Sequence, residues 1–168
     1  HFRERGSSKI EHEDVFESLR VVIVLFLRSR FFKFAVVGFA GFLINSIGLE
    51  FFSETKLTEN LASTFSKWED KSLLGIAAQP SAWAAALAAE LAIVSNYTFN
   101  NFWTFSKRKI ANPFRFLWKF LHFNLTSFGA ILIQFFVVGL AVLLFGETRL
   151  VRQLSLVFTV VFLIIPYN

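Results

Sequence analysis

Four long apolar stretches dominate the chain and constrain its fold more than any other feature. They cover residues 31–53, 80–105, 115–145 and 150 to the end of the sequence. A helix needs about 20 apolar residues to cross the hydrocarbon core of a bilayer, and the first three stretches reach that length. The fourth is shorter, so we expect its helix to be truncated here and to continue beyond Asn168. The sequence therefore predicts an all-α membrane protein that contains a bundle of four transmembrane helices.

The composition agrees with a bilayer as the main solvent. Apolar residues make up 55% of the chain, which includes 24 Phe, and the mean hydropathy is +0.56. The net charge is +5, but the basic residues flank apolar stretches, as anionic headgroups select, so we do not expect nucleic acid as a partner. The chain has no Cys, which excludes disulfides, thiolate metal sites and a cysteine nucleophile. It begins with His1 and has no Met, so we expect a C-terminal fragment.

Lys and Arg in the connections predict the orientation of the spans. One side of the predicted bundle carries Arg20, Arg28, Arg30, Lys33, Lys107, Arg108, Lys109, Arg115 and Lys119. The other side has fewer basic residues, and acidic residues are mixed with them: Lys56, Lys67, Lys71, Arg149 and Arg152. We therefore predict a multi-pass integral membrane protein whose N-terminal end is cytoplasmic.

Residues 13–30 predict a juxtamembrane helix that lies in the cytoplasmic membrane interface. Its apolar core, Val21 to Leu27, is too short to cross the bilayer, and basic residues bracket it. The alternative is that 15–53 forms one long, bent helix. Acidic residues and a histidine fill positions 11–14, but carboxylates at a helix start are expected from the helix dipole, so we predict no metal site there.

Three polar residues inside the apolar stretches form a candidate intramembrane cluster. Asn45, Glu90 and Gln134 fall at a depth of roughly 18–26 Å from the cytoplasmic basic anchors at the helical rise of 1.5 Å per residue. A carboxylate at such a depth is costly and suggests a function such as a proton or substrate relay. The alternative, which we favour, is a protonated Glu90 that hydrogen-bonds to amides and holds helices together.

The second apolar stretch ends in "SNYTFNNFWTFSKRK", which combines amides, aromatic residues and a basic tail. Through Asn96, Asn100 and Trp103 this segment resembles the signature of the GtrA-like membrane family, and "FFKFAVVGFAGFLIN" resembles that family's opening helix. Asn101 departs from the pattern, because the family usually carries Arg at this position. The resemblance implies that 31–168 is a four-helix membrane domain associated with polyprenyl-phosphate-linked sugars.

The opening segment "RERGSSK" matches the pattern R-x-x-G-x-S-K. It resembles the last segment of the catalytic domain in family-2 glycosyltransferases, notably dolichyl-phosphate mannose synthases, some of which are fused to a GtrA-like domain. The resemblance makes residues 1–12 the C-terminal edge of such a domain and Arg3, Gly6, Ser8 and Lys9 its phosphate-binding positions. Chemically, the two cations can neutralise phosphate, the hydroxyl can donate to it, and the glycine permits close backbone approach.

These resemblances imply a membrane-anchoring domain of a polyprenyl-phosphate glycosyltransferase. The parent enzyme would transfer a hexose, with mannose the expected sugar, from a nucleotide sugar to dolichyl or polyprenyl phosphate at the cytoplasmic face. Mg²⁺ or Mn²⁺ and the catalytic residues are expected in the missing catalytic domain, so no catalytic residue is expected in this chain. Membrane lipid and polyprenyl phosphate are the expected direct partners, the nucleotide sugar would bind through the missing domain, and a homo-oligomer is left open.

Two other functions remain open from the sequence. The first is a stand-alone GtrA-like protein that assists the translocation of polyprenyl-phosphate-linked sugars in polysaccharide or glycan biosynthesis. The second is a small proton-coupled exporter that uses Glu90.

The predicted topology can be tested with single cysteines, because the chain has none of its own. We expect both predicted hairpin loops, 54–79 and 146–149, to lie on the non-cytoplasmic side. An impermeant thiol reagent added to intact cells should therefore label a cysteine at Ser66 and leave one at Ser106 unlabelled. The reverse labelling pattern would show that the orientation is inverted.

Overall fold

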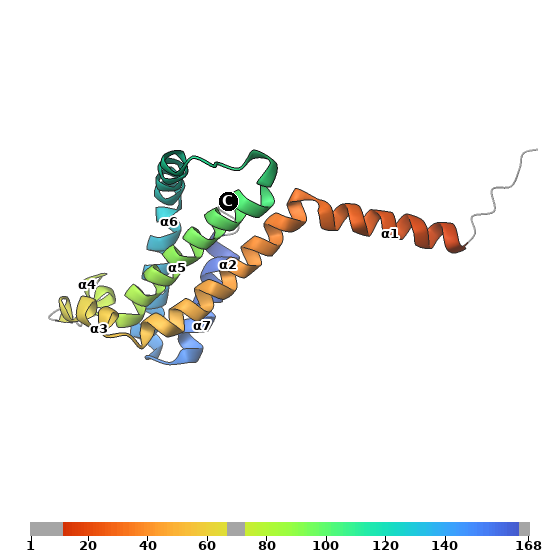
Figure 1. The fold of residues 1–168 in the computed structure, drawn as a ribbon. Coiled ribbons are helices and arrows are strands. Elements are labelled where there is room, and N and C mark those ends of the chain that lie inside the picture. The colour runs from red at the N-terminus through yellow and green to blue at the C-terminus, as the bar shows by residue number, and fades with distance from the viewer. Residues whose placement is uncertain (1–11, 67–72, 165–168) are drawn as a thin grey trace, which may run out of the picture.

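The computed structural model describes residues 12–66 and 73–164, and every regular element in these ranges is helical. The phosphate-binding positions predicted from the opening segment, Arg3, Gly6, Ser8 and Lys9, lie outside the described residues. Figure 1 shows a bundle of helices from which one helix extends far to the side. An α-helical membrane bundle is thus consistent with the described residues.

The extended helix is α1 (His12–Arg28), and the first bundle helix, α2 (Arg30–Ser53), follows it directly. The chain leaves helical geometry at Ser29, whose ψ is 150° and whose Oγ accepts a hydrogen bond of 3.1 Å from the Phe32 amide. This N-cap satisfies one of the free amides of α2 and starts a new helix. Residues 12–53 therefore form two helices rather than one continuous helix.

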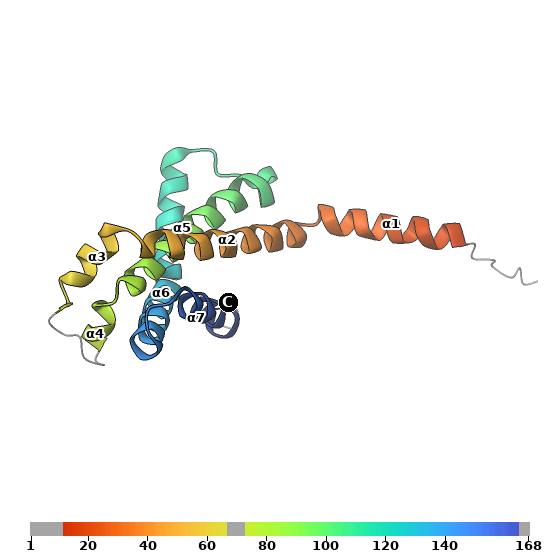
Figure 2. The same cartoon turned by 90° about the horizontal axis from the view of Figure 1, so that it is seen from below.

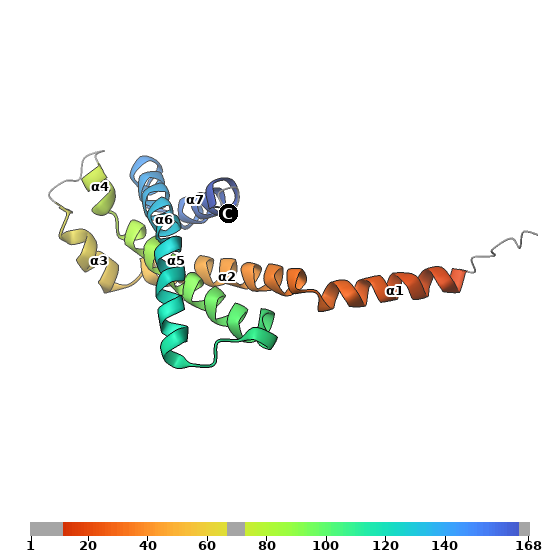
Figure 3. The same ribbon diagram turned by 90° about the horizontal axis from the view of Figure 1, so that it is seen from above.

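Helix α1 makes little contact with the bundle. The side chains of residues 15–28 are exposed, and the helix points away from the other elements in each of the three views (Figures 1, 2 and 3). An isolated helix with an apolar side needs a surface to cover that side. The interfacial position predicted for 13–30 stays a prediction.

The bundle is built around α5 (Pro80–Phe99), which packs against α2 on one side and crosses α6 (Pro113–Phe145) on the other (Figure 3). Helix α7 (Arg149–Phe158) packs on α6 and continues as the π-helical segment η4 (Thr159–Ile164). Side chains of the four α-helices meet in a core of Leu49, Ala84, Ala85, Ala88, Val138 and Leu156. The alanines of α5 let its neighbours approach closely, as small residues do in membrane bundles.

Two short helices cover the end of the bundle near the start of α5. Helix α3 (Lys56–Ser63) packs on α5, and α4 (Leu73–Ala77) leads into it (Figure 2). The Trp83 indole Nε1 donates a 2.8 Å hydrogen bond to the Ala77 carbonyl, and its ring stacks on Phe65 at a centroid distance of 5.9 Å. These contacts join the connection between α2 and α5 to the bundle.

Two of the described helices are long and apolar enough to cross a membrane: α2 and α6. Only 28% and 22% of their most apolar windows are buried inside the protein, whereas the core helix of a soluble protein would be mostly buried. Their exposed faces carry large apolar side chains such as Phe39, Ile47, Leu125 and Phe128, which suit lipid contact. These observations support a membrane protein, and the count of four spans stays a prediction.

A substitution at Gly139 tests how closely α6 packs against the start of α5. A Cβ added there would lie 2.5 Å from Ile76 Cγ2 and 2.8 Å from Ala82 Cβ, so Gly139→Ala should destabilise the protein by about 1–3 kcal/mol. The matched control is Gly129 on the same helix, where an added Cβ meets no described atom within 4 Å. Gly129→Ala should stabilise the helix by about 0.5–1 kcal/mol. Thermal unfolding in detergent measures both, and equal melting temperatures for the two variants would contradict the packing described here.

Candidate functional site

The carboxyl end of α5 departs from α-helical geometry in the segment that carries the predicted family motif. Residues Asn100–Thr104 form the π-helical turn η2, in which the Phe105 amide donates a 2.8 Å hydrogen bond to the Asn100 carbonyl. A short 3₁₀ turn, η3 (Ser106–Arg108), then leads toward α6. Single π turns occur often at functional sites because they place side chains where an α-helix would not.

A cavity of about 350 Å³ lies beside this turn, between the start of α2, the end of α5 and the start of α6. Its wall combines aromatic rings with polar and cationic side chains: Phe34, Tyr97, Phe105, Phe123, Ile110, Asn100, Asn101, Arg108 and Lys119. The volume falls within the range of small-molecule sites, and the mixture suits a ligand with an apolar part and an anionic part.

Tyr97 fixes the wall of the cavity that α5 and α6 share. Its hydroxyl donates a 3.2 Å hydrogen bond to the Phe116 carbonyl, and its ring contacts Phe116, Phe120 and Phe123 at centroid distances of 4.9–5.4 Å. Such aromatic contacts each add stability beyond the area they bury. The contacts of Tyr97 therefore fix this wall of the cavity through the packing of α5 on α6.

Arg108 and Lys119 give the cavity an unpaired positive charge. In the described part of the chain, every ion pair involves Glu50 or Glu147, which lie at the opposite end of the bundle. Lys33 is adjacent in sequence to the lining residue Phe34, and its ammonium lies 5.9 Å from the centre of the Trp103 ring, within cation–π range. An anion that enters the cavity thus meets cations that no described carboxylate neutralises.

Three polar atoms on one face of α5 and η2 are buried without a hydrogen-bond partner among the described residues. They are Asn96 Oδ1, Asn100 Oδ1 and Thr104 Oγ1, which recur every fourth residue. The Asn96 amide lies directly against Gly41 of α2, where a Cβ would collide with it. Buried acceptors of this kind normally have partners, so they are suited to accept hydrogen bonds from a ligand or from water.

Asn101, at the position where the GtrA-like family usually has Arg, shapes the loop beside the cavity. Its Oδ1 accepts a 2.9 Å hydrogen bond from the Ile110 amide, and its Nδ2 donates to the Ile110 carbonyl at 3.4 Å. The side chain is buried, and it holds the 105–110 segment against η2. The predicted motif positions Asn96, Asn100 and Trp103 all lie at this end of the bundle.

The predicted intramembrane cluster divides into two separate contacts. Asn45 and Gln134 exchange a pair of amide hydrogen bonds of 3.0 and 2.9 Å, and Gln134 also donates to the Ala85 carbonyl at 3.0 Å. Glu90 lies apart from them and accepts a hydrogen bond from Asn124 Nδ2. Both contacts join neighbouring helices, as interhelical hydrogen bonds do in membranes.

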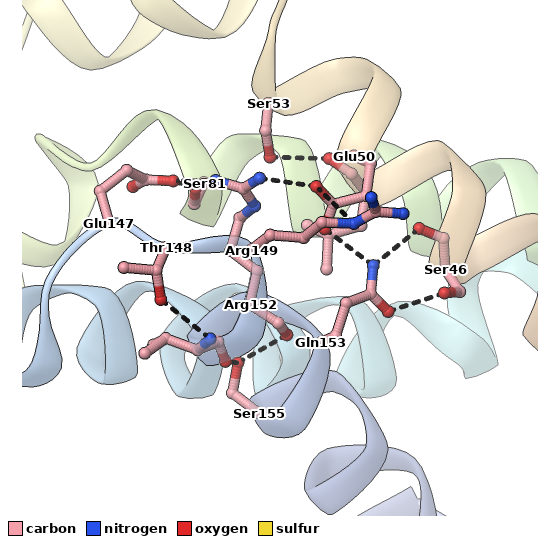
Figure 4. Close-up of polar contacts among 12 residues, drawn as sticks. Ser46, Glu50, Ser53, Ser81, Glu147, Thr148, Arg149, Arg152, Gln153 and Ser155 are labelled. Atoms are coloured by element: carbon pink, nitrogen blue, oxygen red, sulfur yellow. Dashed lines mark hydrogen bonds and ion pairs between the residues drawn. The ribbon is translucent and has the colours of Figure 1, made fainter.

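A polar network at the other end of the bundle was not predicted from the sequence. Figure 4 shows Arg152 and Gln153 of α7 reaching Glu50 and Ser46 of α2, with Glu147 between Arg152 and Ser81. The available signal was an acidic residue in the last turn of the first apolar stretch and an arginine in the first turn of the fourth. The charge count that predicted the orientation placed Arg152 and Glu147 on the same side, but it did not include Glu50 and did not predict any pairing.

Comparison with known families gives one match. The model of the family described as "GtrA/DPMS, transmembrane domain" matches residues 71–168, which include α5, α6, α7 and the motif segment around η2. No curated protein and no solved structure matches the chain.

Glu90→Gln separates a hydrogen-bonding role of Glu90 from a proton relay. The amide keeps an acceptor for Asn124 and loses the titratable proton, so the variant should keep its melting temperature in detergent and the activity of the parent protein within a few-fold. Glu90→Leu leaves Asn124 Nδ2 without this partner and should destabilise the protein by about 0.6–1.7 kcal/mol. A folded Glu90→Gln protein that is inactive, together with an active Glu90→Asp protein, would instead indicate a relay.

Proposed function

Because the chain belongs to the family of GtrA/DPMS transmembrane domains, we propose that it is the membrane domain of a polyprenyl-phosphate glycosyltransferase. In this proposal the parent enzyme transfers a hexose, with mannose the expected sugar, from a nucleotide sugar to dolichyl or polyprenyl phosphate. The domain binds the head of that lipid. The observation that carries the proposal is the cavity with its unpaired cations beside η2.

The chemistry of the cavity suits a lipid phosphate. Arg108 and Lys119 can form charge-assisted hydrogen bonds with a phosphate, and the guanidinium can do so with two oxygens at once. The aromatic side chains Phe34, Phe105 and Phe123 offer apolar surface to the first isoprene units of the tail. Of the three unpaired acceptors, Asn100 lines the cavity and suits a hydroxyl donor of a sugar attached to the phosphate.

The predicted topology places this cavity where a lipid headgroup lies. With the N-terminal end cytoplasmic and four spans, the basic residues around η2 and the start of α6 lie at the cytoplasmic headgroup plane. In that arrangement α1 rests in the interface and carries the catalytic domain, of which residues 1–12 form the edge. Phosphate binding by Arg3, Gly6, Ser8 and Lys9, and Mg²⁺ or Mn²⁺ in the catalytic domain, belong to the same proposal.

A second function, assistance in the translocation of polyprenyl-phosphate-linked sugars, is favoured by the depth of the unpaired acceptors. Asn96 lies one helical turn further into the bundle than Asn100, against Gly41 of α2. A headgroup that only docks at the membrane surface does not need an acceptor at that depth. Transfer of a fluorescent lipid-linked sugar between leaflets of vesicles that contain the chain alone would distinguish translocation from anchoring.

Neutralising the cavity cations tests the proposed headgroup site. Each charge-assisted hydrogen bond contributes about 1.5–3 kcal/mol, so Arg108→Gln and Lys119→Gln should each weaken binding of polyprenyl phosphate by roughly 10- to 100-fold. Binding is measured on the purified chain in neutral-lipid nanodiscs, with uncharged polyprenol as the second probe. Polyprenol binding should change little in either variant.

The matched controls are Lys107 and Lys109, which flank Arg108 in sequence, are exposed and do not line the cavity. Lys107→Gln and Lys109→Gln should keep polyprenyl phosphate affinity within about threefold, because their side chains do not line the cavity and a distant surface charge contributes little. Equal losses in all four variants would mean that general surface charge, rather than the cavity, attracts the lipid. Full binding by Arg108→Gln and Lys119→Gln would refute the site.

A further inference from the structure

Arg152 lies at the centre of an ionic contact at the end of the bundle opposite the cavity, in which Arg152 and Glu50 are largely buried and the Glu147 side chain is 45% exposed. Its Nη1 lies 2.6 Å from Glu147 Oε1 and its Nη2 lies 2.6 Å from Glu50 Oε2, while 11% of its side chain is exposed. Its Nε is buried and has no hydrogen-bond partner in the part of the chain that the structure describes. One guanidinium thus bridges carboxylates from α2 and from the connection between α6 and α7.

Neighbouring side chains extend this contact and attach α7 to two other helices. Gln153 Nε2 donates to Glu50 Oε1 at 2.8 Å, and Ser46 Oγ donates to Gln153 Oε1 at 2.7 Å. Ser81, at the start of α5, donates to Glu147 (Figure 4). The start of α7 is therefore held on α2 by polar contacts, the connection before it is held on α5 through Glu147, and the apolar anchor of α7, Leu156, lies further along the helix.

Stable packing of α7 on α2 does not require charged side chains at this contact. A buried ion pair can usually be replaced by well-packed apolar side chains without loss of stability, whereas removal of one partner alone is strongly destabilising. Ionisable residues within apolar membrane segments cost free energy to bury and commonly serve a function. The incomplete pairing of Arg152 Nε makes the closed state less stable than a fully paired one would be.

The structure also provides a second cation for Glu50. Arg149 Nε lies 3.8 Å from Glu50 Oε2, and its side chain is 81% exposed. Arg149 and Arg152 are three residues apart and lie on the same side of α7. Glu50 therefore keeps a positive partner when Arg152 moves away, which gives the contact two paired arrangements rather than one.

The chain on either side of α7 can accommodate such a movement. Helix α6 ends at Phe145, and its C-cap Gly146, which has a φ of +91°, lies three residues before α7 begins at Arg149. The π-helical η4 follows α7, so neither end of the helix continues as regular α-helix. Hinges of this type change their backbone angles while the helix between them moves as a unit.

We propose that Arg152 is a releasable latch that holds α7 on α2. In the closed state Arg152 bridges Glu50 and Glu147. In the open state α7 swings about Gly146 so that Arg152 leaves Glu50, while Arg149, which lies nearer to Gly146 and moves less, stays beside Glu50 and takes its place. Opening gives water access to the bundle at the end opposite the cavity, and this inference does not depend on the ligand of the cavity.

The test uses a cysteine at Ser155, because this side chain is 7% exposed in α7 and the chain has no other cysteine. The full chain in detergent is reacted with a maleimide, and the labelling rate reports opening. Arg152→Gln and Glu50→Gln should each raise that rate by about tenfold or more, because one member of the buried pair is lost. Arg149→Gln should leave it within about twofold, because an exposed ion pair contributes little to the closed state.

The double variant Arg149→Gln and Arg152→Gln tests the exchange of partners, because it leaves Glu50 with neither arginine. It should label faster than Arg152→Gln alone, and an equal rate would overturn the role given to Arg149. Unchanged helical circular dichroism and elution volume show that Arg152→Gln and Glu50→Gln are folded. If the folded variants label no faster than the Ser155→Cys protein that keeps Arg152 and Glu50, there is no latch.

Two measurements apply even where those variants fail to fold. In the chain with an intact network, amides of 149–158 should exchange hydrogen for deuterium faster than those of α2, and exchange as slow as in α2 would overturn the proposal. Glu147→Gln loses one charge of the bridge but keeps an acceptor for Ser81 and Arg152. It should raise the labelling rate by a smaller factor than Arg152→Gln, and no increase would count against a shared bridge.

Discussion

The close contact between α2 and α5 is the constraint on which the rest of the structure depends. Gly48 lies so near Ala88 that an added Cβ would be 3.3 Å from the Ala88 Cβ, and Gly41 leaves room only for the amide of Asn96. Small residues allow helix backbones to approach in a solvent that provides no hydrophobic drive between helices. Because α5 is held in this way, its other face is available to α6, and its two ends fix the cavity and the ionic network.

In the described part of the chain, charged side chains are unpaired at one end of the bundle and paired at the other. Around the cavity, Arg108 and Lys119 have no carboxylate partner among the described residues, and buried acceptors on η2 are unpaired as well. At the other end, Arg152 is shared by two carboxylates, and neighbouring amide and hydroxyl groups complete the network. The proposed ligand site therefore rests on polar groups that lack described protein partners, and the proposed latch rests on charges that are paired except at Arg152 Nε.

The lipid-facing surface and the cavity suit the same class of molecule. Helices α2 and α6 present phenylalanine and aliphatic side chains outward, and aromatic residues also line the cavity beside the cations. In the function proposed above, the tail of a long-chain lipid phosphate stays in the bilayer while its head enters the cavity. Membership of the GtrA/DPMS transmembrane-domain family fits this view of a protein that handles sugar–phosphate lipids in the membrane.

Several features were accessible from the sequence because they depend on local physics. The apolar stretches at 31–53 and 115–145 correspond to α2 (Arg30–Ser53) and α6 (Pro113–Phe145), since a helix satisfies all backbone hydrogen bonds within one segment and needs an apolar run of about this length to cross lipid. Pro80 and Pro113 start helices, as fixed φ and a missing amide favour. The family resemblance rested on two short continuous segments, at the end of the second apolar stretch and at the start of the first, so no tertiary information was needed to find it.

Tertiary structure alone decided which polar side chains meet. Depth along a helix placed Asn45, Glu90 and Gln134 at one level, but successive residues are rotated by about 100° around the axis, so depth does not give direction. In the fold Asn45 and Gln134 face each other, whereas Glu90 faces Asn124 of α6. The cavity depends on a π turn that displaces Asn100 and Asn101, and the Arg152 contact joins residues that are 102 positions apart. Composition and periodicity determined which segments are helices, and the packing of their faces determined the sites.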